Sequence, residues 1–286
     1  MASLARPITE ASCVIRQTHR KKGRTRWLAP GWAAVSHLHY GRIILGEGDA
    51  PVSISTGGHE TGLICLGGRG TVRTSAGSYD LAPYDALYIP RDSDVEVESS
   101  AEGCDLAEIS AAVQHRYPPR FISFDEARRD SGLHFIPGQA GCTRDLTILI
   151  GKNVEAGRLV AGVTFSEPGN WTSWPPHEHA AMLEEAYLYI AMPAPAWGIQ
   201  LVYTDPEQPE LVVVVREGDC VVMPQGYHPN VAAPGSSIGF LWMMAAHREV
   251  EDRQFGVVNV QPEYATGGSG LEAGRAKPEA GQARPR

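Results

Sequence analysis

The feature that most restricts the fold of this chain is a succession of short apolar runs, which Gly, Pro, Asp and Ser separate, with almost no helical periodicity. Such runs, joined by glycine-rich turns, are typical of β-sandwiches and β-barrels. The sequence therefore predicts an all-β fold with little helix. The best helix candidate is short, with Ser123 as N-cap of residues 124–129 and Glu126 completing a capping box. The predicted strands cover residues 35–45, 62–65, 70–74, 86–89, 95–97, 146–150, 159–165, 197–204, 211–215, 220–223 and 239–244.

The second half of the chain repeats the design of the first half. Residues 84–90 (Tyr-Asp-Ala-Leu-Tyr-Ile-Pro) are similar to residues 218–224 (Gly-Asp-Cys-Val-Val-Met-Pro). A glutamate heads an apolar run in each half, Glu60 in the first and Glu185 in the second. Overlaying the two prolines places an aspartate, Asp94, where the second half has a histidine. Two degenerate copies of one β-rich unit predict two tandem barrels. Only the second barrel carries a full set of candidate metal ligands.

We divide the chain into four segments on this basis. An N-terminal arm covers residues 1–30 and carries many basic side chains, so we expect it to be solvated and partly extended. Residues 31–140 form a barrel without metal, and residues 141–262 form a metal-binding barrel that packs tightly against it. The tail, residues 263–286, contains Gly, Ala, Pro, Glu and Arg without an apolar pattern and is predicted to be disordered.

Three histidines of the second half lie in two motifs that suit a metal ion. The first motif is Pro-Pro-His-Glu-His, which contains His177 and His179, and the second is Pro-Gln-Gly-Tyr-His, which ends at His228. Alternate side chains of an extended segment share one face, so His177 and His179 point the same way. Single histidines are more often hydrogen-bonded core or surface residues. The combination of a paired motif, a third histidine and a nearby glutamate favours a metal site.

The choice of the acidic ligand depends on the alternation of the run that starts at Glu185. Glu185 shares a face with Tyr187 and Tyr189, whereas Glu184 shares the other face with Ala186. We therefore predict Glu185 as the ligand. Imidazoles together with a carboxylate suit a borderline divalent ion such as Zn, Mn or Fe.

Composition argues against several functional classes. The chain has 286 residues, a net charge of −8 and a pI near 5.7, which argues against a nucleic-acid partner. It contains neither an apolar run of membrane-spanning length nor the layout of a signal peptide, so we expect no membrane partner. The cysteines are odd in number and scattered, which indicates a reduced, cytoplasmic chain with thiols in the core: Cys13, Cys65, Cys104, Cys142 and Cys220.

The motifs of the second half resemble those of the 5-deoxy-glucuronate isomerase family of inositol catabolism, which belongs with the uronate ketol-isomerases of pectin breakdown. The resemblance is densest over residues 145–247 and weaker from about residue 31, and it rests on residues 168–179, 183–187, 200–205 and 218–229. It implies a bicupin, two tandem cupin (jelly-roll type) barrels. It also implies a divalent metal on four side chains, which fall on His177, His179, Glu185 and His228.

The reaction implied by the resemblance converts the aldehyde sugar acid 5-deoxy-glucuronate into its keto isomer, 5-dehydro-2-deoxy-gluconate. Three positions depart from the family pattern: Glu178 stands for a Lys, Ala180 for an Asp, and Leu201 for an Arg. The missing Lys and Arg would weaken the hold on a substrate carboxylate if they lined the pocket.

An aldose–ketose isomerase needs groups that move protons beside the metal. Tyr187 is a candidate because it shares a face with the predicted ligand, and Tyr203 and Tyr227 lie in segments directed at the same cavity. Each of these tyrosines has an alternative role as a core residue. Arg144 is placed either to pair with a carboxylate or to form a salt bridge between the two halves.

Two other functions compete with the isomerase. One is a metal cupin that acts on a different small metabolite, such as a dioxygenase or another uronate isomerase, because the same ligands serve iron oxygenases. The other is a non-catalytic sugar-binding cupin with a structural metal. The expected partner is a small sugar acid. A homo-oligomer is a further possible partner state, since bicupins often associate through strand edges.

Overall fold

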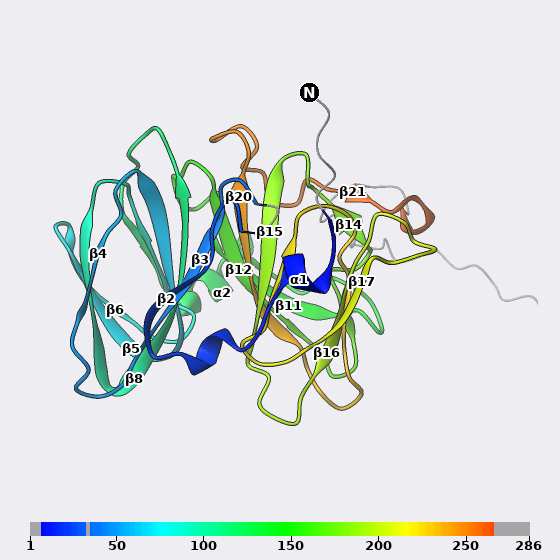
Figure 1. Ribbon diagram of the computed structural model, residues 1–286, viewed down its shortest axis with the longest axis horizontal. Coiled ribbons are helices and arrows are strands. Elements are labelled where there is room, and N and C mark those ends of the chain that lie inside the picture. Colours follow the sequence, from blue (N-terminus) through cyan, green and yellow to red (C-terminus); the bar gives the residue numbers. More distant parts are fainter. Residues whose placement is uncertain (1–6, 33–34, 266–286) are drawn as a thin grey trace, which may run out of the picture.

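The structure is a computed structural model that describes residues 7–32 and 35–265, and it consists of two β-barrels packed side by side (Figure 1). The first barrel uses the first half of the chain and the second barrel the second half. The predicted all-β fold of two tandem barrels is confirmed. Within the described ranges, no helix has the length and apolar character needed to cross a membrane.

The N-terminal barrel is built from one 8-stranded sheet whose central path is β2-β3-β8-β5-β7-β9. Two of its strands are long enough to bend through both faces of the barrel, and β4 and β6 pair with these two. The pairing of the two long strands shifts register near Gly67 and Gly68, where the sheet turns the corner. The strands are β2 (Gly23–Leu28), β3 (His39–Leu45), β4 (Val52–Ser55), β5 (His59–Thr74), β6 (Gly77–Leu81), β7 (Ala86–Ile89), β8 (Asp94–Ala112) and β9 (Arg120–Ile122).

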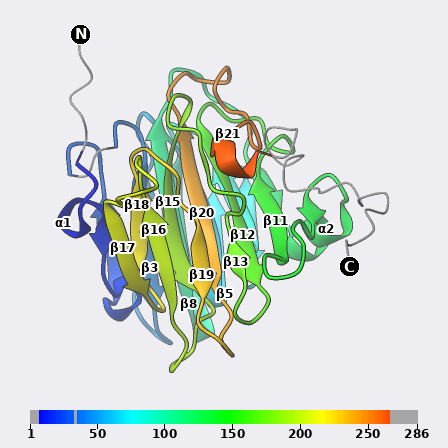
Figure 2. The ribbon, with the colours of Figure 1, turned by 90° about the vertical axis from the view of Figure 1, so that its right-hand side faces the viewer.

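The C-terminal barrel places a 4-stranded sheet in front of a 7-stranded sheet (Figure 2). The larger sheet has the order β1-β18-β15-β20-β12-β11-β10, the smaller has the order β13-β19-β16-β17, and β14 pairs with β21. The strands are β1 (Val14–Ile15), β10 (His134–Phe135), β11 (Arg144–Ile150), β12 (Leu159–Ser166), β13 (Trp171–Thr172), β14 (His177–Glu178), β15 (Leu183–Ile190), β16 (Gly198–Val202), β17 (Leu211–Val215), β18 (Cys220–Met223), β19 (Asn230–Ala232), β20 (Gly239–Ala246) and β21 (Asn259–Val260).

Helices are short and lie at the edges of the barrels. The predicted helix is present as α2 (Phe124–Arg129), and the Ser123 side chain accepts a hydrogen bond from the backbone N–H of Glu126. A second helix, α1 (Glu10–Cys13), was not predicted, although Thr9 and Ser12 form its capping box. Two 3₁₀ turns, η1 (Thr18–Arg20) and η2 (Pro262–Tyr264), complete the helical elements of the described ranges.

The N-terminal arm differs from the solvated segment expected from its charge. Its strand β1 pairs with β18 of the C-terminal barrel, and its strand β2 pairs with β3 of the N-terminal barrel. Because only one face of β2 meets the protein, its side chains alternate between exposed and half-buried, and the many polar residues hide the strand from an apolar-run search. At the other end, η2 spans the predicted boundary at residue 263 and so overlaps the start of the segment predicted as a disordered tail, and residues 266–286 lie outside the described residues.

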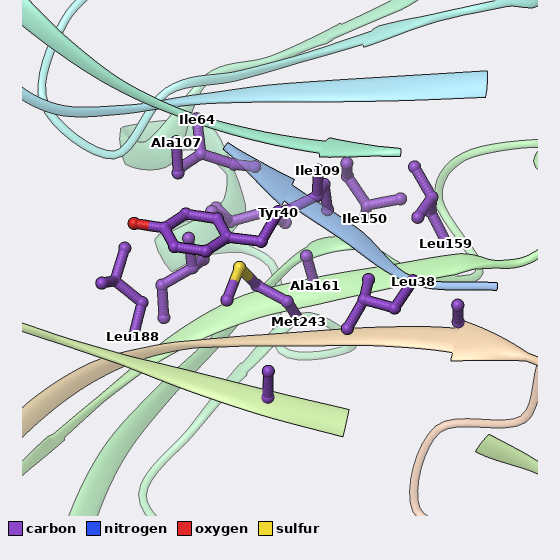
Figure 3. Close-up of a cluster of buried hydrophobic side chains, with 14 of the residues drawn as sticks. Leu38, Tyr40, Ile64, Ala107, Ile109, Ile150, Leu159, Ala161, Leu188 and Met243 are labelled. Atoms are coloured by element: carbon purple, nitrogen blue, oxygen red, sulfur yellow. The ribbon is translucent and has the colours of Figure 1, made fainter. Parts of the chain in front are cut away.

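The interior contains three apolar clusters, and the largest one joins the two barrels. It lies between the sheet that contains β5 and the sheet that contains β15. Figure 3 shows part of it, with the Tyr40 ring between side chains of both halves such as Ile64 and Met243. The other two clusters fill the lumen of each barrel. All five cysteines are buried and unpaired, as the composition predicted.

Strand β15 separates the central cluster from the lumen of the C-terminal barrel. Ala186 and Leu188 belong to the central cluster, whereas Tyr187 and Tyr189 belong to the cluster of the lumen. The strand is buried on both faces, and its side chains alternate between them. Consecutive residues of β15 therefore serve different tasks.

Two buried carboxylates bind backbone N–H groups across the junction of the barrels. Glu184 accepts hydrogen bonds from the N–H groups of residues 36, 37 and 38, the segment that enters β3. Glu60 accepts hydrogen bonds from the N–H groups of residues 157, 158 and 159, the segment that enters β12, and from the Tyr88 hydroxyl. Each half thus uses a glutamate at the start of its central strand to hold the other half.

These contacts correct the sequence overlay by one residue. Glu185 pairs with Met223 in β18, and Thr61 pairs with Ile89 in β7. Met223 and Ile89 both precede the overlaid prolines, so the counterpart of Glu185 in the first half is Thr61. Glu60 is instead the counterpart of Glu184. Both candidate positions near the start of each strand are buried, so an apolar pattern does not tell which of them faces the lumen. The sequence therefore did not reveal the offset.

Candidate metal centre

Three histidines converge at one end of the C-terminal barrel. The ligand atoms that His177, His179 and His228 offer all lie within 4.8 Å of one another, and no other such group of His, Cys, Asp or Glu exists in the part of the chain that the structure describes. His177 lies in β14, His179 follows it, and His228 lies in the turn between β18 and β19. Residues 51 positions apart are brought together because β18 pairs with β15, which follows the first motif.

Backbone carbonyl groups orient the three imidazole rings. Nδ1 of His177 lies 2.8 Å from the Pro175 carbonyl oxygen, and Nδ1 of His179 lies 3.3 Å from the Leu183 carbonyl oxygen. Nδ1 of His228 lies 2.9 Å from the Gly226 carbonyl oxygen. A carbonyl can only accept, so each Nδ1 carries a proton, and each Nε2 is the atom that can bind a metal once its ring is neutral. This arrangement is the one that metal-binding histidines adopt in proteins.

The turn before His228 requires glycine. Gly226 has a φ of +86°, and a Cβ there would lie 2.4 Å from the carbonyl oxygen of Tyr203. Only glycine adopts this conformation without strain, and its own carbonyl oxygen then accepts the hydrogen bond from His228 Nδ1. From behind, the Gln200 side chain donates to the His228 carbonyl oxygen at 2.9 Å. The turn fixes the ring through Gly226, and β16 supports the His228 backbone through Gln200.

Glu185 faces the same point as the histidines. Its Oε2 lies 2.9 Å from His179 Nε2 and 3.1 Å from His228 Nε2, and the side chain is 1% exposed. Two buried atoms of this group lack a hydrogen-bond partner, Glu185 Oε1 and His228 Nε2. Unsatisfied buried polar atoms are costly, so their convergence indicates a group that a bound cation would satisfy.

The protonation states also suit a cation. Burial, with His228 and His179 nearby, lowers the pKa of His177 to about 3, so this ring is neutral at ordinary pH. Burial by itself would raise the pKa of Glu185, but His179 and His228 lower it below the usual range, and the side chain is ionised. Burial lowers the pKa of His179, but Glu185 raises it by more, so a metal must displace a proton from this ring. Neutral imidazoles and one carboxylate then form a typical donor set for Zn, Mn or Fe. The residues present therefore fit a divalent metal.

His177, His179 and Glu185 line a pocket within the C-terminal barrel, and His228 lies beside the first two rings without lining the pocket. Tyr187 lines the pocket, its hydroxyl lies 2.8 Å from the Ser173 hydroxyl, and its ring centroid is 5.8 Å from that of His228. Arg144 also lines the pocket. The walls are mainly apolar and include Phe240 and Trp242, and residues 255–260 close one side, where β21 pairs with β14. A polar centre in an apolar pocket is typical of a small-molecule site.

Other predicted residues lie outside this lining. Tyr203 and Tyr227 bind each other through both backbone N–H groups, and the Tyr203 hydroxyl donates to Gln261 at 2.8 Å. Neither tyrosine lines the pocket. The departures Glu178 and Leu201 are likewise absent from the lining, so they remove no cation from it.

Sequence reasoning missed part of the pocket. Ser173 precedes the first histidine motif and has a φ of +51°, a conformation that no sequence pattern predicted. The segment 255–260 closes the pocket without any alternation of apolar residues. Its position follows only from pairing with β14 after the chain has left the last barrel strand.

Two barrels, with one cluster of imidazoles and a carboxylate among the described residues, define a bicupin with a candidate metal centre in its second barrel. The sequence pattern that defines the KduI/IolB family matches residues 14–260. The chain therefore belongs to the KduI/IolB family, in agreement with the resemblance of its motifs.

Similar curated proteins include two that are called 5-deoxy-glucuronate isomerase. The protein from Geobacillus kaustophilus is 28% identical over 233 residues, which cover 75% of this chain and 80% of that protein. The protein from Geobacillus thermodenitrificans is 31% identical over 172 residues, which cover 58% of this chain and 60% of that protein.

Solved structures support the fold. An IolB-like protein from Salmonella typhimurium has a TM-score of 0.78 with 21% identity, and the match covers 89% of this chain and 98% of that one. Oxalate decarboxylase from Bacillus subtilis, in a variant with a single substitution, has a TM-score of 0.56 with 12% identity, covering 78% of this chain and 73% of that one. At these identities the likeness concerns the arrangement of the barrels.

Proposed function

We propose that this chain is a metal-dependent aldose–ketose isomerase that converts 5-deoxy-glucuronate into 5-dehydro-2-deoxy-gluconate in inositol catabolism. The observation that carries the proposal is the convergence of three imidazoles and the Glu185 carboxylate at the pocket of a KduI/IolB family member. The names of the related curated proteins support the isomerase class and the substrate.

His177, His179, His228 and Glu185 are the residues that would hold the ion. A divalent cation bound there supplies Lewis-acid polarisation of the substrate carbonyl and stabilises negative charge on the carbonyl and adjacent hydroxyl oxygens. The proposed ligands need little rearrangement for this task, because backbone carbonyls already orient the rings.

The isomerisation moves one hydrogen from C2 to C1 and one proton from the C2 hydroxyl to the carbonyl oxygen, so no co-reactant is needed. Tyr187 is the proposed proton-handling group, since its hydroxyl lies in the pocket lining and Ser173 holds it at 2.8 Å. The apolar walls limit access of water to the reacting carbons. Tyr203 and Tyr227 hold the turn before His228 rather than meeting the substrate.

Two variants test the proposal directly. His177→Ala and His228→Ala each remove one proposed ligand, and we expect both to lose bound metal and isomerase activity together. Metal content is measured by elemental analysis of the purified proteins, and activity by conversion of 5-deoxy-glucuronate. Full metal retention in both variants would refute the ligand assignment, whereas oxygen consumption by the iron-loaded protein would favour an oxygenase.

A further inference from the structure

One charged side chain of the pocket has no counter-charge. Arg144 begins β11 and is 7% exposed, and its hydrogen bond runs from Nη1 to the Cys142 carbonyl oxygen at 3.2 Å. No carboxylate of the described ranges lies within ion-pair distance of it. Arg42, the other arginine that is buried in the described ranges, forms a two-pronged pair with Asp105 at 2.7 and 2.6 Å.

An unpaired buried cation carries a free-energy cost. Removal from water disfavours the charged guanidinium, and burial indeed lowers the pKa of Arg144. A salt bridge between the two halves, the alternative considered for this residue, is not formed. The cost is offset if an anion enters the pocket and binds the free nitrogen atoms.

The chemistry of the pocket defines that anion. Arg144, His177 and His179 line the same pocket, whose walls are otherwise apolar or uncharged apart from Glu185. A molecule that fits both features carries carbonyl and hydroxyl oxygens at one end and a carboxylate at the other. The family departures do not disturb this match, because Glu178 and Leu201 lie outside the lining.

We propose that Arg144 binds the substrate carboxylate and makes the pocket selective for sugar acids over neutral sugars. A guanidinium binds a carboxylate through two parallel N–H···O bonds, which fixes the orientation of the ligand as well as its charge. This inference rests on the proposed function, since a sugar-acid substrate supplies the carboxylate. Arg144 orients the far end of the substrate while the reacting carbons lie at the metal ligands.

The test uses a sugar acid that cannot isomerise. D-gluconate and its neutral counterpart D-glucitol are titrated calorimetrically into the Mn²⁺-loaded full-length protein, and KM and kcat are measured with 5-deoxy-glucuronate. We expect Arg144→Met to weaken gluconate binding about 10- to 100-fold, the range for charge-assisted hydrogen bonds, with glucitol binding unchanged. KM should rise by a similar factor, and metal content should stay at the wild-type level.

Two further variants keep the result interpretable. Arg128→Gln removes a surface guanidinium that pairs with Asp145, the neighbour of Arg144, and it should bind both ligands as the wild type does. Arg144→Lys keeps the charge but loses the two-pronged geometry, so its preference for gluconate should fall by a smaller factor. This variant carries the test if Arg144→Met does not fold.

The outcomes separate this inference from the proposed function. Equal preference for gluconate in the wild type and the Arg144 variants would overturn the inference, as would a wild type that binds gluconate no better than glucitol. Either result can occur while 5-deoxy-glucuronate is still isomerised. Conversely, Arg144-dependent binding of gluconate by a protein that isomerises no uronate would retain the carboxylate site and refute the isomerase.

Discussion

Glu184 and Glu185 are adjacent in sequence, yet we expect their replacement by glutamine to affect different properties. Glu184 accepts three backbone N–H groups of the segment before β3, including those of residues 37 and 38 at 2.6 and 3.1 Å. Glu185 instead faces His179 and His228 at the pocket. Glu184→Gln should therefore destabilise the junction of the barrels and keep the metal, whereas Glu185→Gln should lose the metal.

The magnitude for Glu184 follows from its hydrogen bonds. A bond to a charged acceptor contributes about 1.5–3 kcal/mol, and glutamine both loses the charge and turns one oxygen into an NH₂ group that faces an N–H donor. With two of three bonds lost or weakened, the free energy of unfolding should fall by about 3–5 kcal/mol. At about 2–4 °C per kcal/mol for a chain of this size class, the Tm should fall by roughly 6–20 °C.

The assay compares thermal unfolding of both variants and the wild type after chelation, followed by metal titration of each. Removal of the Glu185 carboxylate should weaken metal binding at least about 100-fold, beyond the effect of losing an outer hydrogen-bond partner. A Glu184→Gln protein with the wild-type Tm would refute the role of Glu184 at the junction. Loss of metal from Glu184→Gln with retention in Glu185→Gln would refute the assignment of the two faces.

Further predictions concern both barrels. Glu60→Gln should lower the Tm of the metal-free protein as much as Glu184→Gln does, and its metal affinity in a titration should equal that of the wild type. Tyr187→Phe should lower kcat about 100-fold or more while the metal content stays constant. Burial lowers the pKa of His179, but Glu185 raises it by more, so a proton on this ring competes with the metal. Metal affinity measured calorimetrically should therefore fall as the pH decreases, and metal binding should release protons. Gln200→Ala should weaken metal binding about tenfold, because the His228 backbone loses its support.

Much of the fold was open to prediction because its signals are local. Short apolar runs with turn residues indicate strands, and the repeat of a proline-ended run in both halves indicates two similar barrels. The alternation along residues 185–190 separates two faces because side chains of a strand point to opposite sides. The structure shows Glu185 on the lumen face and Glu184 on the opposite face.

The N-terminal arm and residues 255–260 show where local signals end. Strand β1 of the arm and strand β21 of the later segment pair with β18 and β14, which lie far away in the sequence, and β2 of the arm adds a polar strand at the edge next to β3. Their positions follow from free edges that exist only after the barrels have formed. A search along the chain for apolar runs has no access to those edges.

The sequence by itself determined the all-β class, the repeat, the residue types of a metal centre and the parity that separates Glu184 from Glu185. The tertiary structure alone decided that three imidazoles approach one another, that Tyr187 lines the pocket while Tyr203 does not, and that Arg144 lacks an acidic partner among the described residues. The physical reason is that side-chain chemistry and strand periodicity are properties of neighbouring residues. Convergence and unpaired charge, in contrast, depend on which distant segments the closed barrels bring into contact.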